Sequence, residues 1–129
     1  MNKKQDILAP ISLGELIDKI TILQIKTNHL EGQALHNVKN ELNSLELILN
    51  NLDISIEPTL ISNLKKINAE LWSIEDQIRD HERQKNFDEK FVLLARSVYQ
   101  QNDLRSATKK QINTTYGSSL IEEKSYKAY

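Results

Sequence analysis

Two stretches with heptad-spaced apolar residues decide the fold that this sequence predicts: LHNVKNELNSLELILNNL (residues 35–52) and LISNLKKINAELWSIEDQI (residues 60–78). In both stretches apolar residues recur every three or four positions, which is the spacing of one helix face. These positions are Leu35, Val38, Leu42, Leu45, Leu49 and Leu52 in the first, and Leu60, Leu64, Ile67, Leu71, Ile74 and Ile78 in the second. Because only a short link separates the stretches, we expect two helices (34–52 and 58–84) packed as a long, antiparallel, coiled-coil-like hairpin.

A further helix is expected before this hairpin, over residues 12–31. Ser12 followed by Glu15 is a capping box, in which each side chain bonds a free backbone N–H at the helix start. Apolar residues occupy more than one stripe of this helix, so we expect neighbours to cover it on more than one side. They include Leu13, Leu16, Ile17, Ile20, Ile22, Leu23, Ile25 and Leu30.

A fourth helix is expected over residues 87–116, with Asn86 as its N-cap and a break near residue 102 left open. A leader (1–11) and a tail (117–129) complete the chain, which we interpret as a single domain (1–129). No stretch alternates like a strand. The sequence therefore predicts an all-α protein, an antiparallel bundle of about four helices with the hairpin at its centre.

The amino-acid composition argues against several classes of function. The 17 basic and 18 acidic residues nearly balance, so no overall field draws the chain to nucleic acid or to an anionic membrane. The chain has no cysteine, which excludes disulfides and thiolate metal sites, and its three histidines are dispersed. No apolar run is long enough for a bilayer. We expect a soluble cytoplasmic protein without cofactor or metal.

The apolar face of the fourth helix turns polar after Val98. The same spacing continues through Asn102, Arg105 and Lys109 to Ile112. Desolvated cations need acids, a bound anion or water, so two interpretations stay open. The stripe is either a pocket for a phosphate or carboxylate, with Arg96, Asn102, Arg105 and Lys109 as candidate ligands, or the solvated end of the helix.

Acidic partners for these cations are available on two other helices. Asp18 and Lys19 lie near the start of the first helix, where capping explains Glu15 and where a surface position is the alternative for Asp18. The third helix carries Glu75, Asp76 and Arg79 beside Trp72, the only tryptophan. Together with Arg96 and Asp103, these side chains are candidates for an interhelical ion-pair network.

Several motifs resemble a family of short bacterial and phage proteins known only as a domain of unknown function. They are ISLGELIDKI (11–20), LWSIED (71–76), LARSVYQQNDLR (94–105) and GSSLIEEKSY (117–126). The resemblance spans nearly the whole chain and implies a shared fold but no activity. It also implies a surface-polysaccharide setting, because genes for such proteins often lie near those for polysaccharide synthesis.

Two functional hypotheses follow. The first is a non-enzymatic interaction or assembly module that self-associates or binds another helical protein, which the heptads and the lack of a catalytic signature favour. The second is a small helical enzyme or binding protein for a phosphorylated or carboxylated metabolite, held by the cations of the fourth helix.

Overall fold

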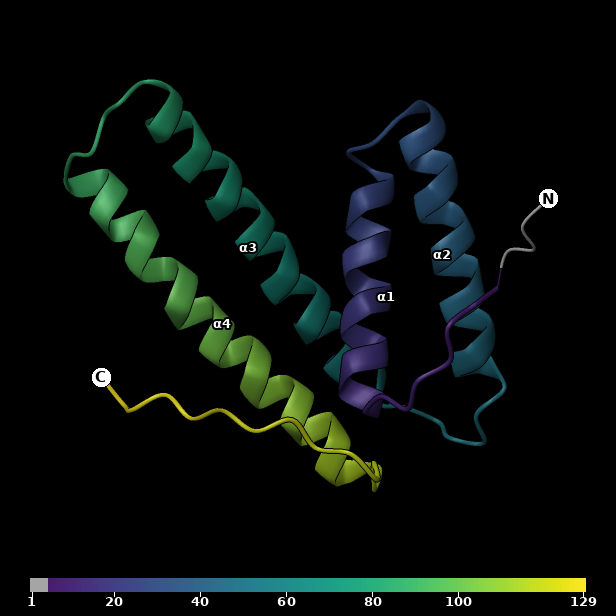
Figure 1. Cartoon of the computed structure of the whole chain (residues 1–129). Helices are drawn as coiled ribbons and strands as arrows, with labels where there is room; N and C mark the ends of the chain where they lie inside the picture. The colour runs from purple at the N-terminus through teal and green to yellow at the C-terminus, as the bar shows by residue number, and fades with distance from the viewer. Residues whose placement is uncertain (1–4) are drawn as a thin grey trace.

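The computed structural model describes residues 5–129, and these form four α-helices and no strand (Figure 1). The helices are α1 (Leu13–Thr27), α2 (Gly32–Asn50), α3 (Pro58–Arg83) and α4 (Glu89–Thr115). The predicted all-α fold with about four helices is confirmed. The predicted leader falls partly on residues 1–4, which lie outside the described residues, and α4 runs through residue 102 without a break.

Pairing of the helices differs from the prediction. α1 pairs with α2, and α3 with α4, while α2 and α3 are not in contact (Figure 1). The predicted central hairpin is therefore wrong, because α1 lies between its two members and contacts all three other helices. The broad apolar surface of α1 gives the physical reason: a helix that is apolar on several sides gains most from burial at the centre.

Burial follows this arrangement. Most of the fully buried apolar side chains belong to α1, whereas no residue of α2 is fully buried. The core is built where α1, α3 and the end of α4 meet, around Leu13, Ile17, Leu64 and Ile112. From there the two hairpins diverge, so the molecule has two arms (Figure 1).

Local signals at the helix ends are partly as predicted. Ser12 caps α1 and accepts a 3.1 Å hydrogen bond from the Glu15 backbone N–H. Only this half of the capping box forms within residues 5–129, because the Glu15 carboxylate binds lysines instead. The N-cap of α4 is Asp88 and not Asn86, whose N–H closes the end of α3 by donating to the His81 carbonyl.

Candidate functional site

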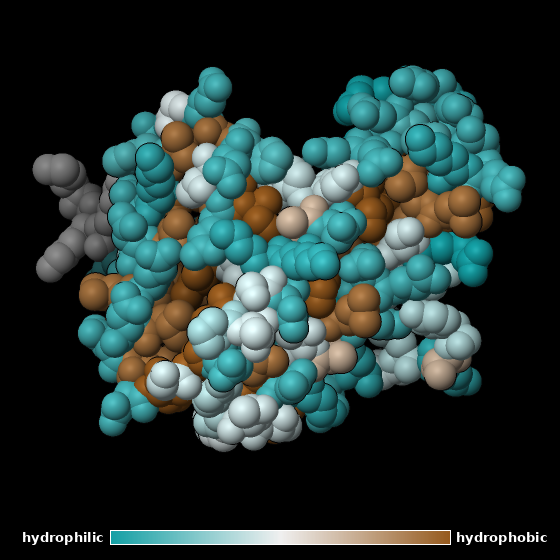
Figure 2. Space-filling model, turned by 180° about the vertical axis from the view of Figure 1, so that it is seen from behind, coloured by the Kyte–Doolittle hydropathy of each residue, from teal (hydrophilic) through white to brown (hydrophobic). Residues whose placement is uncertain are grey.

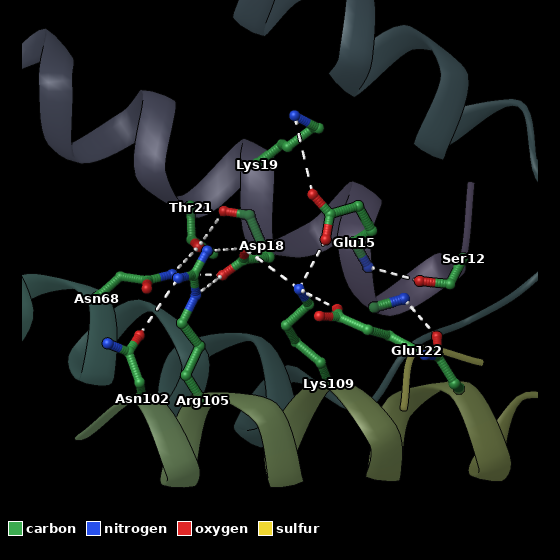
Figure 3. A network of polar contacts seen from close by, with 12 residues as sticks. Ser12, Glu15, Asp18, Lys19, Thr21, Asn68, Asn102, Arg105, Lys109 and Glu122 are labelled. Atoms are coloured by element: carbon green, nitrogen blue, oxygen red, sulfur yellow. Dashed lines mark hydrogen bonds and ion pairs between the residues drawn. The ribbon is translucent and has the colours of Figure 1, made fainter. Parts of the chain in front are cut away.

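The centre of the candidate site is the carboxylate of Asp18, which is 1% exposed on α1 (Figure 3). Arg105 of α4 binds it through a fork: Nε donates to Oδ1 at 2.9 Å and Nη2 donates to Oδ2. Asn68 of α3 donates from Nδ2 to the same Oδ1 at 2.9 Å and to Thr21 Oγ1 at 3.0 Å. Side chains of three helices therefore meet at one buried carboxylate.

Lys109 extends the site by one helical turn along α4. Its ammonium lies 2.6 Å from a Glu15 oxygen, 2.9 Å from Glu122 in the C-terminal tail and 3.8 Å from Asp18. The tail lies along α4, which brings Glu122 to this position (Figure 1). Two cations of α4 thus meet three carboxylates of the chain.

These contacts determine the charge states. Burial by itself raises the pKa of Asp18, but hydrogen bonds from Arg105 and Asn68 outweigh it and hold that pKa below its ordinary value. The hydrogen bonds to Asp18 raise the pKa of Arg105. Burial lowers the pKa of Lys109, yet Glu15 and Glu122 reverse this and raise it. Asp18, Arg105 and Lys109 are therefore charged at neutral pH.

A close approach of two backbones brings the acids of α1 onto the cations of α4. The Gly14 N–H donates to Asn113 Oδ1 at 2.6 Å, and a Cβ at position 14 would lie 2.6 Å from the Lys109 carbonyl oxygen. Only glycine lets the helices pack this closely. One turn further along α1, the same contact places Asp18 beside Arg105.

The structure separates the predicted site residues of α1 and α4 into two groups. Asp18, Arg105 and Lys109 come together, with Asn102 3.5 Å from Arg105 Nη1, and Lys19 joins at the edge through a 3.8 Å pair with Glu15. Arg96 and Asp103 are exposed and lie outside this cluster, and Asp103 instead raises the pKa of Tyr129 by hydrogen bonding. The polar stripe of α4 thus meets acids of its own chain.

Several members of the cluster were not predicted from the sequence, among them Asn68, Thr21 and Glu122. Asn68 interrupts the apolar face of α3 one turn after Leu64, and a polar residue there signals a buried polar contact. Glu122 gave no such signal, because it lies in a non-helical tail whose course no periodicity describes.

Next to the cluster, an open groove of about 420 Å³ lies where α1, α3 and α4 meet. It is lined by Ile22, Asn68, Leu71, Trp72, Glu75, Asp76, Arg79, Asn102 and Arg105. Glu75 and Arg79 pair with each other at 2.9 Å, and the Trp72 ring stacks on His29 at 4.6 Å between centroids. The third-helix candidates therefore form one wall of this groove.

Comparison with family models gives a match over residues 7–129 to DUF6165, a family of unknown function. The chain belongs to this family. The match confirms the resemblance expected from the sequence motifs, and it assigns no activity. No curated protein and no solved structure matches the chain. None of the described helices is long and apolar enough to cross a membrane.

The lowered pKa of Asp18 predicts a pH-dependent stability difference. The pKa of Asp18 is lower in the folded state than its ordinary value of about 4 in the unfolded state. Ionised Asp18 therefore stabilises the fold fully above about pH 4, and this contribution is lost as the pH falls through the pKa of the folded state. We expect Asp18→Asn to be less stable than wild type at pH 7 by about 3 kcal/mol, and this gap to shrink below about pH 4. Urea denaturation at pH 7, 5, 4 and 3 measures the gap.

Asp80→Asn is the control, because Asp80 is exposed on α3 and its one ion pair within residues 5–129 is with exposed Arg83. It should show a small difference at every pH. A gap for Asp18→Asn that stays constant from pH 7 to pH 3 would contradict the ionised, stabilising carboxylate.

Proposed function

We propose that this protein is a non-enzymatic assembly module that forms a homodimer through an exposed apolar surface on α2. The observation that carries the proposal is the incomplete coverage of this helix. The chain exposes 9506 Å², whereas a compact 14.9 kDa monomer exposes about 7,000 Å². Part of the excess belongs to the extended end segments, and part belongs to helix faces that no neighbour covers.

Apolar side chains gather where α2 ends and the link to α3 begins. We call the residues Leu47, Ile48, Leu52 and Ile54 the α2 face; their exposed fractions run from 38% to 62%. Ile7, Leu8 and Ile11 line a hollow of about 630 Å³ together with Ile48, Leu52 and Ile54. Figure 2 shows apolar surface over this half of the molecule, at the left. Exposed apolar surface of this kind is typical of a protein interface.

A second copy fits this face better than a smaller ligand does. The excess surface is about 2,500 Å² per chain with the end segments included, and each chain of an obligate dimer buries about 1,000 Å² or more, so a part of the excess is enough for a dimer interface. Among the residues that line the hollow, Lys19 and Glu41 carry charge and the others are uncharged, and the cores of homodimer interfaces are likewise poor in charged residues. We also propose that the protein is cytoplasmic and that it acts in the surface-polysaccharide or phage setting that the family resemblance implies.

The second hypothesis, a binding protein for an anionic metabolite, has less support from the geometry. Arg105 and Lys109 were its candidate ligands, and both already bind carboxylates of the chain. An anion entering there would have to displace Asp18, Glu15 or Glu122, at the cost of leaving a carboxylate unpaired.

A charge placed in the α2 face tests the proposal. We expect Ile48→Glu to convert a dimer into a monomer, because a carboxylate at the centre of an apolar interface loses its hydration without a partner. Light scattering coupled to size-exclusion chromatography measures the mass. Leu93→Glu is the matched control: Leu93 is 54% exposed on α4, away from the α2 face, and its variant should stay dimeric. An unchanged mass in Ile48→Glu would contradict the assignment of this face.

A further inference from the structure

The C-terminal segment lies along α4 as an extended strap (Figure 1). We call residues 120–129 the strap; every residue in it is exposed, and none belongs to a helix or strand. Two ion pairs hold its first half: Glu122 lies 2.9 Å from the Lys109 ammonium, and Glu123 lies 2.9 Å from that of Lys110. Charge, and not the burial of apolar side chains, therefore holds this part of the strap on α4.

Lys109 binds three carboxylates that differ in how firmly the fold holds them. Asp18 is 1% exposed and also binds Arg105, and Glu15 lies one turn before it on α1. Glu122 instead lies in the strap, and its side chain is 43% exposed. When Glu122 leaves Lys109 it returns to water, so its release strands no buried charge. Glu122 is therefore the partner of Lys109 that a competing anion can replace.

A hollow of about 230 Å³ lies at the Lys109–Glu122 pair, and all its lining residues are polar or charged. This volume is below the range of pockets for drug-sized ligands, about 300–1,000 Å³, and suits a small anion. Ser106 and Lys109 line it from one face of α4, because residues three positions apart are neighbours on a helix. Hydroxyl and ammonium groups donate hydrogen bonds to phosphate oxygens. The hollow thus offers donors for an oxyanion where Glu122 now lies (Figure 3).

The strap also balances the charge of this surface. Without it, the ion-paired groups of α1 and α4 at this place comprise four cations and two acids: Lys19, Arg105, Lys109 and Lys110 against Glu15 and Asp18. Glu122 and Glu123 supply the two missing negative charges, while Lys124 pairs with Glu122 at 3.5 Å and moves with the strap. The hydrogen bond from Lys109 lowers the pKa of Glu122, so this carboxylate is itself an anion at neutral pH. An anion that replaces it meets an excess of positive charge.

We propose that the strap is a gate over a phosphate site, with Glu122 in the position of the anion while the gate is closed. A phosphate group that accepts hydrogen bonds from Lys109 and Ser106 takes the place of this carboxylate, and the strap then leaves α4. The strap contributes no residue to the hollow beside the α2 face, so the gate is independent of the proposed dimer.

NMR of the ¹⁵N-labelled full chain tests the gate. At constant pH and ionic strength, we expect sodium phosphate to shift the amide signals of Ser106 and Lys109 saturably. We also expect the order parameters of the strap to fall below about 0.6, the range of flexible backbone. Sodium chloride at the same ionic strength should give neither change, because it screens the ion pairs without filling the site.

A parallel titration with glycerol 2-phosphate distinguishes the two sources of the phosphate group. Tighter binding of the ester indicates a larger phosphorylated ligand, and tighter binding of the free ion indicates inorganic phosphate.

Substitution of the strap carboxylate supplies the second arm. We expect Glu122→Gln to bind phosphate at least threefold more tightly than wild type, because it removes the competing charge and keeps the shape of the side chain. Glu82→Gln is the matched control: Glu82 pairs with exposed Lys85 on α3, outside the hollow, and its variant should bind phosphate like wild type. The proposal fails if phosphate gives no saturable change, if chloride releases the strap equally well, or if Glu122→Gln binds phosphate no more tightly than wild type.

Discussion

Arg105→Leu is expected to lower the free energy of unfolding by about 3–5 kcal/mol, which is a large part of the stability of a domain of this size. The substitution keeps much of the apolar stem but removes the fork that satisfies both oxygens of Asp18. Asp18 is 1% exposed and cannot exchange this partner for water. Lys109, at 3.8 Å, recovers only part of the loss. Chemical denaturation at pH 7 measures the change.

Arg83→Leu is the matched control, because Arg83 also forms an ion pair but on the surface of α3. Exposed pairs contribute about 0–1 kcal/mol, so this variant should be nearly as stable as wild type. The double variant Asp18→Asn/Arg105→Leu should lose less than the sum of the single losses, since the two side chains stabilise each other. Equal losses for Arg105→Leu and Arg83→Leu would overturn the role given to the buried pair.

Leu64→Ala is expected to cost about 2–5 kcal/mol, the range for truncating a buried leucine. Leu64 is fully buried among Leu13, Ile17 and Ile112, where α1, α3 and α4 meet. A cavity there cannot be filled without moving α1, which the Gly14–Asn113 contact holds against α4. The change is measured by the same denaturation at pH 7.

Leu104→Ala serves as the control for Leu64, because Leu104 is 53% exposed on α4 and its truncation leaves no cavity. We expect a loss below about 1 kcal/mol for this variant. If the two leucine variants lose the same amount, the core does not lie at the junction of the three helices.

The sequence predicts the helices of this fold better than their partners. Periodicity identifies which face of a helix is buried, and the faces predicted for α3 and α4 are buried or half-buried over most of their length. It does not identify what covers a face. The heptads of α2 and α3 are compatible with a mutual hairpin, yet α1 lies between them. The decisive signal was the broad apolar surface of α1, which marks it as the central helix.

The candidate site was predicted in part, for a similar reason. The polar stripe after Val98 led to Arg105 and Lys109, because cations on a buried face need partners. Which acids supply them depends on contacts far apart in the sequence: 87 residues separate Asp18 from Arg105. A surface position was an alternative for Asp18, and the packing of α1 against α4 places it in the interior. Glu122 depends on the course of the tail, which no helical period describes.

Assembly of the chain through the α2 face requires a dimer in solution, which sedimentation equilibrium of the wild-type protein over a range of concentrations measures. We expect a mass of twice 14.9 kDa that falls toward the mass of one chain only on strong dilution. A mass of one chain across the whole range, up to the highest concentration at which the protein stays in solution, would contradict it.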